Sequence, residues 1–223
     1  MMINVVKGLW RSSKETEWER CINRYWHLDS VQTNLEAERR MENLNPQVFE
    51  KYNAEQFYDL LANQRSGYYR WKFGAQQADG NLKALQTFKQ LPNNAAGGEF
   101  NRIKEDLLTF DHHDIRQGLE IVKQFPGMQD KAGLGFLSVL FKPDFGTVDK
   151  WVIKILQHLD QFDFPTMNVT VRKIDPDHPT TDEVVQIIQI FREKASELNQ
   201  QFASKKWTPR RIDMALFSLK DAI

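Results

Sequence analysis

The sequence predicts an all-α protein, and three observations lead to that fold class. Apolar residues recur at the spacing of one helix face in nearly every segment. Strand-like alternation is confined to Val169 and Val171, within an irregular connection from Pro165 to Pro179. Signals that start helices recur along the chain, and they are Ser12-x-x-Glu15, Asn45-Pro46, Asn53-x-x-Gln56, Asp114, Thr180-x-x-Glu183 and Thr208-Pro209.

These signals and the apolar spacing place the predicted helices in order along the chain. The Ser12-x-x-Glu15 capping box opens a helix that ends near Trp26. The stretch Asn-Asn-Ala-Ala-Gly-Gly at 93–98 is predicted to be a loop, and Pro143 with Gly146 ends a later helix. The predicted helices cover 12–26, segments from 46 and from 54, one or two stretches within 68–88, 100–109, 114–124, 129–141, 148–159, 180–202 and a last segment from 208.

The composition describes a chain that can bury a core and that shows no cofactor motif. Of its 223 residues, 41% are hydrophobic and 27% are charged, and the formal net charge is zero. The single cysteine, Cys21, excludes an intrachain disulfide and any metal centre built from several thiolates. We find no Gly-rich nucleotide loop, nucleophile elbow or zinc-binding spacing in the sequence. We therefore expect no cofactor and no metal.

The hydropathy and the charge pattern bound the compartment and the partners. No apolar run approaches the length of a membrane span, and the first residues lack the apolar core and cleavage site of a signal peptide. A lone cysteine fits a reducing cytoplasm. Zero net charge argues against strong non-specific nucleic-acid binding. Basic residues nevertheless outnumber acidic ones over 65–89 and 192–223, so we expect a local basic face.

One stretch, from Lys123 to Leu156, raises a functional hypothesis: it reads KQFPGMQDKAGLGFLSVLFKPDFGTVDKWVIKIL. Phe125-Pro126-Gly127-Met128 separates two runs of helical period, which is typical of a helix–hairpin–helix. In such a turn, backbone N–H groups and the amino end of the second helix face one spot, where a DNA phosphate can bind. An ordinary Pro-Gly connector between two helices is the alternative.

With the residues that follow, this stretch resembles the helix–hairpin–helix DNA glycosylase superfamily, which includes endonuclease III and the 8-oxoguanine glycosylases. The family pattern is roughly Leu-Pro-Gly-Val-Gly-x-Lys-x-Ala, an apolar helix, and then Val-Asp-x-His-Val. Lys131 falls at the family lysine, and Val148-Asp149-x-x-Val152 matches the aspartate motif without a gap between the two. The chain departs from the pattern at Gln129, at Gly133, and within Lys150-Trp151, where the family has histidine.

Further blocks are similar to bacterial 8-oxoguanine-glycosylase-like proteins and extend the resemblance over about residues 67–216. They are GYYRWKF at 67–73, LSVLF at 137–141, FGTVD at 145–149 and WTPRRIDMAL at 207–216. The resemblance implies a two-lobed helix–hairpin–helix glycosylase-like fold. We expect a single domain over 1–223, with the hairpin and a catalytic aspartate inside 114–160.

The resemblance assigns the chemistry to Asp149 and Lys131. Breaking an N-glycosidic bond builds positive charge on the sugar, which a carboxylate stabilises while it orients a water molecule. A plain helix-capping role is the alternative for Asp149. Lys131 matches the lysine that forms a Schiff base in bifunctional members, and a surface or phosphate-binding lysine is the alternative. Asp130 disfavours a nucleophilic amine if the two side chains interact, so we expect weak lyase activity at most.

Two further sets of residues are predicted to contact DNA. Those expected to bind the DNA backbone are Gly127, Met128, Gln129, Lys150, Arg210 and Arg211. A base that leaves the stack needs a pocket with aromatic and hydrogen-bonding walls. The residues expected in that pocket are Tyr68, Tyr69, Arg70, Trp71, Lys72 and Trp151, although each aromatic fits a core position equally well.

The sequence therefore predicts a DNA glycosylase that leaves an abasic site, a monomer of the cytoplasm and nucleoid whose partner is DNA. An oxidised purine is the base that the resemblance favours, and a bulky modified base of phage DNA is the alternative. Two other functions stay open. One is a non-catalytic nucleic-acid-binding protein of the same fold, and the other is a helical interaction protein without a DNA role.

Overall fold

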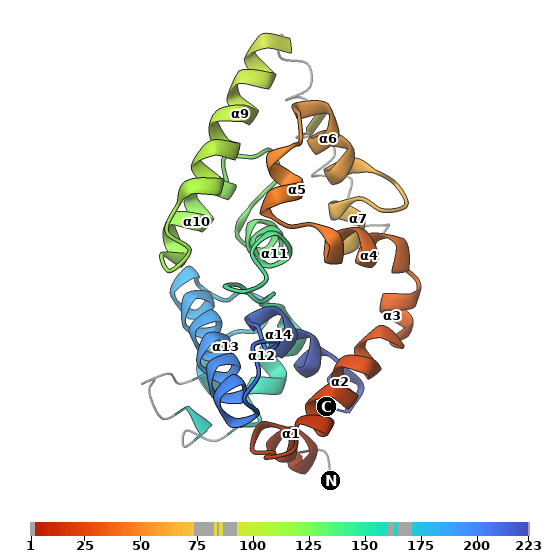
Figure 1. The fold of residues 1–223 in the computed structure, drawn as a ribbon, viewed down its shortest axis with the longest axis vertical. Coiled ribbons are helices and arrows are strands. Elements are labelled where there is room, and N and C mark those ends of the chain that lie inside the picture. Colours follow the sequence, from red (N-terminus) through yellow and green to blue (C-terminus); the bar gives the residue numbers. More distant parts are fainter. Residues whose placement is uncertain are drawn as a thin grey trace. The chain divides into compact units, whose positions relative to one another are not determined.

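All regular structure in the described part of the chain is helical, which confirms the predicted fold class. The structure, a computed structural model, describes residues 3–73, 83, 85–86, 93–159, 163–164 and 171–222. Within these ranges, no helix is both long and apolar enough to cross a membrane. The helices are α1 (Ile3–Trp10), α2 (Glu15–Trp26), α3 (Asp29–Gln32), α4 (Leu35–Asn43), α5 (Pro46–Glu50), α6 (Ala54–Ala62), α7 (Tyr68–Phe73), α9 (Asn93–Thr109), α10 (Ile115–Val122), α11 (Asp130–Leu140), α12 (Lys150–Leu156), α13 (Thr181–Gln201) and α14 (Pro209–Phe217), with the 3₁₀ turns η2 (Val171–Lys173) and η3 (Lys220–Ala222) (Figure 1).

The chain divides into two compact units. Residues 30–141 form one unit, which we call the central unit. Residues 1–29 and 142–223 form the other, the terminal unit, so both ends of the chain belong to it. In the central unit α11 packs against α10, α7 and α4. In the terminal unit α14 packs against α2, α12 and α13.

Local capping signals predicted several helix starts correctly. Asn53 and Gln56 form a reciprocal capping box at the start of α6. Thr180 and Glu183 do the same for α13. The remaining predicted caps accept a hydrogen bond from the first turn of their own helix: they are Asn45 of α5, Asp114 of α10 and Thr208 of α14.

Three local predictions are wrong. Residues 93–98 belong to α9, because the two alanines favour a helix and the rest of α9 offsets the cost of its two glycines. The capping box at Ser12 does not form, because α2 begins only at Glu15 and Ser12 Oγ accepts from the backbone N–H of Lys14. Val171 lies in a 3₁₀ turn rather than in a strand.

Other predictions are refined or fall outside the described residues. The predicted helix at 148–159 is shorter at both ends, since α12 runs from Lys150 to Leu156. The predicted helices within 68–88 are described only as α7, and most of 74–92 lies outside the described residues, as does Val169. No specific signal in the sequence predicted α1, α3 or α4.

Aromatic rings fill the core of the central unit. Phe57 makes close ring contacts with Phe49, Phe100 and Phe125, at centroid distances of 5.8, 5.1 and 4.5 Å. Phe136 of α11 packs edge-on against the same group, 5.9 Å from Phe57. Each of these five rings is at most 2% exposed. The hairpin is therefore anchored in this core from both sides, by Phe125 in the turn and Phe136 in α11.

A second aromatic group lies in the terminal unit. Trp18 of α2 packs 6.3 Å from Trp10 and 5.9 Å from Trp207, measured between ring centroids. The Lys194 ammonium of α13 lies 5.1 Å from the Trp10 ring and 2.8 Å from the Glu197 carboxylate. This group joins the start of the chain to its last third.

The turn between α10 and α11 depends on one glycine. Gly127 has a φ of 76°, in the left-handed region that is strained for residues with a Cβ atom. Met128 follows it and is fully buried, and its N–H donates to the carbonyl of Phe125. A left-handed residue here reverses the chain while the side chains of Phe125 and Met128 stay in the core.

We expect Gly127→Ala to lower the free energy of unfolding by about 1–2 kcal/mol, the cost of a left-handed non-glycine residue. Gly98→Ala is the matched control, because Gly98 lies inside α9 and a Cβ atom at this position would meet nothing within 4 Å. It should raise the free energy of unfolding by about 0.5–1 kcal/mol. Urea denaturation measures both. Equal stability of Gly127→Ala and the wild type would contradict the role given to this turn.

Candidate functional site

The hairpin predicted from Phe125-Pro126-Gly127 is present in the central unit. α10 ends at Val122 and α11 begins at Asp130, so the two helices are separate. The Lys123 ammonium lies 3.0 Å from the Asp130 carboxylate and spans the turn. The N-cap residue of α11, the exposed Gln129, makes no side-chain capping hydrogen bond. The amino end of α11 therefore keeps the partial positive charge that attracts an anion.

Two tyrosines of α7 hold this hairpin by its backbone. Tyr69 donates its hydroxyl to the carbonyl oxygen of Pro126, at 2.5 Å, and Tyr68 donates to the carbonyl oxygen of Ala132. Burial raises the pKa of both phenols, so both remain protonated donors. Tyr68 and Tyr69 were predicted as walls of a base pocket. That prediction is wrong, because both side chains lie in the core with at most 1% exposed.

The other predicted site residues of the central unit differ in how exposed they are. Arg70, Trp71 and Lys72 are half-buried on α7, with the Trp71 ring 5.6 Å from the Tyr68 ring. Met128 was predicted to contact DNA, but it is fully buried and cannot reach a ligand in this structure. Gly127 is half-buried and Gln129 is exposed, so these two turn positions remain accessible.

Lys131 is exposed in the first turn of α11. Its neighbour Asp130 forms its ion pair with Lys123, across the turn. A contact between Asp130 and Lys131 was the expected obstacle to a nucleophilic lysine. The ion pair that Asp130 forms is with Lys123 instead. Exposure is now the main argument against a nucleophilic Lys131, since a nucleophilic amine needs a desolvated or strongly cationic site.

Asp149 is the N-cap of α12 in the terminal unit. Its Oδ1 accepts the backbone N–H groups of Trp151 and Val152, each at 2.9 Å. Among the described residues, Oδ2 has no hydrogen-bond or ion-pair partner. The carboxylate is half-buried at the amino end of α12. One oxygen is thus fixed by the helix and the other is available to a ligand.

Cations and an exposed indole follow Asp149 on α12. The Trp151 side chain is 37% exposed, one of the few large apolar residues at the surface of the described chain. The ammonium groups of Lys150 and Lys154 lie 5.6 and 5.1 Å from its ring centre. Lys150 also lies 3.9 Å from the Asp177 carboxylate, at the outer limit of an ion pair. A partly exposed aromatic ring beside two cations is a combination that suits a nucleobase next to phosphate groups.

Arg210, predicted to bind the DNA backbone, is instead buried in the terminal unit. Its guanidinium donates to the carboxylate of Asp213, one turn further along α14, and to the hydroxyl of Tyr25, at 3.2 Å. Burial raises the pKa of Asp213 from 3.8 to about 6. The cation of Arg210 opposes that rise, and the Asp149 carboxylate adds to it. Asp213 was not among the residues predicted from the sequence, although its spacing of three from Arg210 places both on one helix face.

Arg211 and the basic segment around it are matched by acidic residues of α2. Arg211 Nη2 lies 3.1 Å from the Glu19 carboxylate, and Lys206 Nζ lies 2.6 Å from the same side chain. Glu15 accepts a hydrogen bond from Trp207 Nε1 and pairs with Lys206. The predicted contact of Arg211 with DNA is therefore weakened, because its charge is already offset within the terminal unit.

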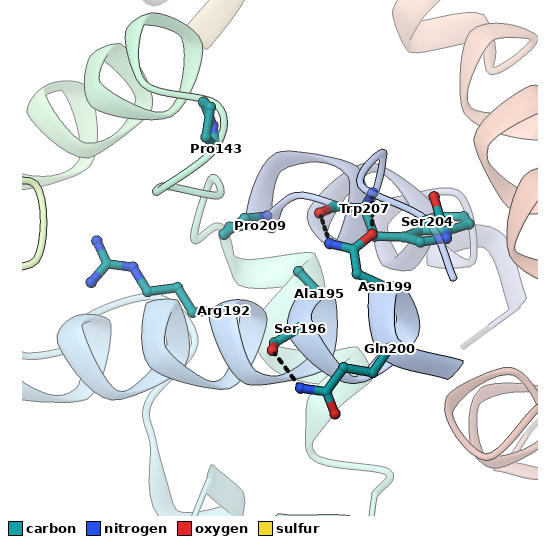
Figure 2. A pocket seen from close by; sticks show the side chains of 9 residues that line it. All are labelled: Pro143, Arg192, Ala195, Ser196, Asn199, Gln200, Ser204, Trp207 and Pro209. Carbon is teal, nitrogen blue, oxygen red and sulfur yellow. Dashed lines mark hydrogen bonds between the residues drawn. The ribbon is translucent and has the colours of Figure 1, made fainter. Parts of the chain in front are cut away.

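The terminal unit also contains pockets apart from these residues. One of about 390 Å³ is lined by Pro143, Arg192, Ala195, Ser196, Asn199, Gln200, Ser204, Trp207 and Pro209 (Figure 2). The Asn199 side chain bridges the backbone N–H and carbonyl of Trp207, at 3.0 and 2.8 Å. The pocket includes no residue of the predicted site. The hydrogen bonds drawn in the pocket join its own residues to one another, Asn199 to Trp207 and Gln200 to Ser196.

No protein-family model, curated protein or solved structure matches this chain. The candidate functional residues are therefore those described above. They are Lys131 and the hairpin in the central unit, and Asp149 with its neighbours in the terminal unit.

Arg210→Met tests the buried pair. It leaves the Asp213 carboxylate buried without its cation, so we expect the free energy of unfolding at pH 7 to fall by about 3–5 kcal/mol. The folded-state pKa of Asp213 is already raised to about 6 and should rise further. Since such a group favours folding in its protonated form, the deficit should shrink as the pH falls from 7 to 5. Denaturation at both pH values measures this.

Arg211→Met is the matched control for that experiment. Its guanidinium is partly exposed and paired with Glu19, so the loss should be about 1 kcal/mol or less. Equal losses for the two variants, or a deficit of Arg210→Met that does not change with pH, would contradict the burial argument.

Proposed function

We propose that this protein is a DNA glycosylase that releases a damaged or modified base and leaves an abasic site. The observation that carries the proposal is Asp149: a half-buried carboxylate at a helix N-terminus, with one oxygen fixed and the other available. It follows the hairpin at the spacing expected from the glycosylase resemblance. Among the functions considered, base excision is the one that needs such a carboxylate.

The proposed chemistry uses the two oxygens of Asp149 differently. The bonds from Trp151 and Val152 to Oδ1 hold the carboxylate in one orientation. As the bond between base and sugar breaks, positive charge develops on the sugar, and Oδ2 stabilises it electrostatically. The same oxygen can orient a water molecule towards the anomeric carbon. A carboxylate held in advance needs little reorganisation during the reaction, which favours the transition state.

Each unit, taken by itself, has residues that we propose to contact DNA. The amino end of α11, beyond the left-handed Gly127, offers backbone N–H groups to a phosphate. Lys131 lies in the same turn and adds a positive charge. In the terminal unit, Trp151 between Lys150 and Lys154 offers an aromatic face for stacking.

Two classes of excised base are candidates: an oxidised purine, and a bulky modified base such as those of phage DNA. Burial of Tyr68 and Tyr69 removes two of the residues predicted to read the base. Arg70, Trp71, Lys72 and Trp151 remain as candidates. Mass spectrometry of bases released from diverse DNAs, including phage DNA, would identify the substrate and separate repair from defence.

A non-catalytic DNA-binding role is the second candidate, and one observation favours it. Both hydrogen bonds of Asp149 are ordinary capping bonds, which a purely structural aspartate would also make. An assay for abasic sites on a panel of modified DNAs distinguishes the two candidates. Absence of both abasic sites and salt-dependent DNA binding would leave only a helical interaction protein.

Asp149→Asn is the sharpest test of the carboxylate, because asparagine caps a helix as well as aspartate does. Fold and DNA affinity should be retained, while single-turnover base release should fall by about 100-fold or more. Asp114→Asn, which changes the N-cap aspartate of α10 in the same way, should leave base release unchanged. Near-normal excision by Asp149→Asn would remove Asp149 from the mechanism.

Borohydride trapping on DNA that contains the correct base tests Lys131. Because Lys131 is exposed, we expect base release with little covalent trapping and with abasic sites that accumulate intact. Lys150→Gln serves as the control for the loss of one positive charge. Strong trapping that disappears in Lys131→Gln but not in Lys150→Gln would show that the enzyme is bifunctional.

A further inference from the structure

The loop that leads into Asp149 is held unusually tightly for a connection between helices. Gly146, Thr147 and Val148 are all buried. A Cβ atom at Gly146 would lie 2.6 Å from the Phe191 ring of α13 and 2.7 Å from the carbonyl oxygen of Pro209. The loop therefore lies directly against α13 and the first turn of α14. Only glycine permits this approach.

The next residue, Thr147, is held by the buried pair of α14. Its backbone N–H donates to Asp213 Oδ2 at 3.2 Å. Its hydroxyl accepts from Arg210 Nη1 at 3.3 Å, and the same guanidinium nitrogen donates to Asp213. Arg210 is 5% exposed and Asp213 is 2% exposed. Both the backbone and the side chain of Thr147 are thus bound by one ion pair.

A buried ion pair is an expensive way to stabilise a fold, because desolvation of both charges offsets much of their attraction. This pair makes contacts that an apolar replacement could not make, namely the hydrogen bonds to Thr147. Thr147 lies two residues before Asp149, and between them Val148 is 3% exposed. Because Arg210 offsets the charge of Asp213, the anchor adds little net negative charge beside Asp149.

We propose that Arg210 and Asp213 are positioning residues that, through Thr147, fix the loop presenting the Asp149 carboxylate. The effect of this positioning on catalysis rests on the proposed glycosylase function. The geometric claim concerns only the terminal unit and can be tested without a substrate. Neither residue contacts DNA in this proposal. They act by keeping Asp149 in the orientation that its two capping bonds define.

Amide hydrogen exchange measured by NMR tests the geometric claim. Asp213→Asn keeps the shape of the side chain and removes its charge. We expect the Thr147 amide, and also the Trp151 and Val152 amides that Asp149 caps, to exchange about tenfold faster, as expected for the loss of a hydrogen bond to a charged group. Thr147→Val removes only the hydroxyl contact and should give a smaller increase at the same amides. If Asp213→Asn does not fold, the exchange rates of Thr147→Val still test the positioning role.

Ser218→Ala is the matched control. It removes another buried polar group at the end of α14, whose hydroxyl donates to the carbonyl of Ala215 at 2.7 Å, away from the loop. It should leave the Thr147, Trp151 and Val152 amides unchanged. If Asp213→Asn and Thr147→Val do not speed exchange at Trp151 and Val152, or if Ser218→Ala speeds it equally, the positioning role is wrong.

Base-release kinetics test the catalytic consequence. At saturating DNA, Asp213→Asn should release base about 100-fold more slowly, the effect of a small misplacement of a catalytic group, with DNA affinity unchanged within about twofold. Arg210→Lys keeps the cation and should give an intermediate rate. Faster exchange without base release by the wild type would overturn the glycosylase function and leave the positioning role intact. An equal loss of rate and DNA affinity would overturn the positioning role.

Discussion

The hydrogen-bonded contact between Arg210 and Asp213 is the interaction on which the terminal unit most depends. One guanidinium connects Tyr25 of α2, Thr147 before α12 and Asp213 of α14, three segments that are far apart in the sequence. Because both charges are buried, each needs the other in order to remain in the core. The pair therefore specifies one arrangement of α2, the Thr147 loop and α14, where apolar packing alone would tolerate several.

The central unit solves a similar problem with neutral groups. The hydroxyls of Tyr68 and Tyr69 bind backbone carbonyls of the hairpin, and the rings around Phe57 fill the space behind it. In both units a buried polar side chain from a neighbouring helix holds the backbone near an exposed helix N-terminus. The two residues with proposed chemistry, Lys131 and Asp149, lie at such termini. Rigidity and accessibility are thus combined within a few residues.

Features that depend on neighbouring residues could be predicted from the sequence, and contacts between residues far apart in the chain could not. The capping boxes of α6 and α13 and the break at Gly127 depend on residues at most three apart, so their patterns predicted them. Tyr68 and Arg210 combine an apolar body with a polar tip, and nothing nearby in sequence shows whether that tip faces solvent. The partner of Tyr68 is 64 residues away and that of Arg210 at Tyr25 is 185 residues away. The catalytic role of Asp149 stays a prediction from the resemblance, while Thr147 and Asp213, which hold its loop, lie 66 residues apart and had no local signal.

The composition of the terminal unit from residues 1–29 and 142–223 also bears on how the protein forms during synthesis. On the ribosome, α1 and α2 emerge before the central unit, yet Trp207, which contacts Trp18, and Arg210, which pairs with Tyr25, come from the last third of the chain. The central unit is complete in sequence by residue 141 and can fold while those partners are still unmade. Trp18 of α2 must remain without its Trp207 contact throughout that interval. Synthesis therefore separates α1 and α2 from the segments that bury them by the whole length of the central unit.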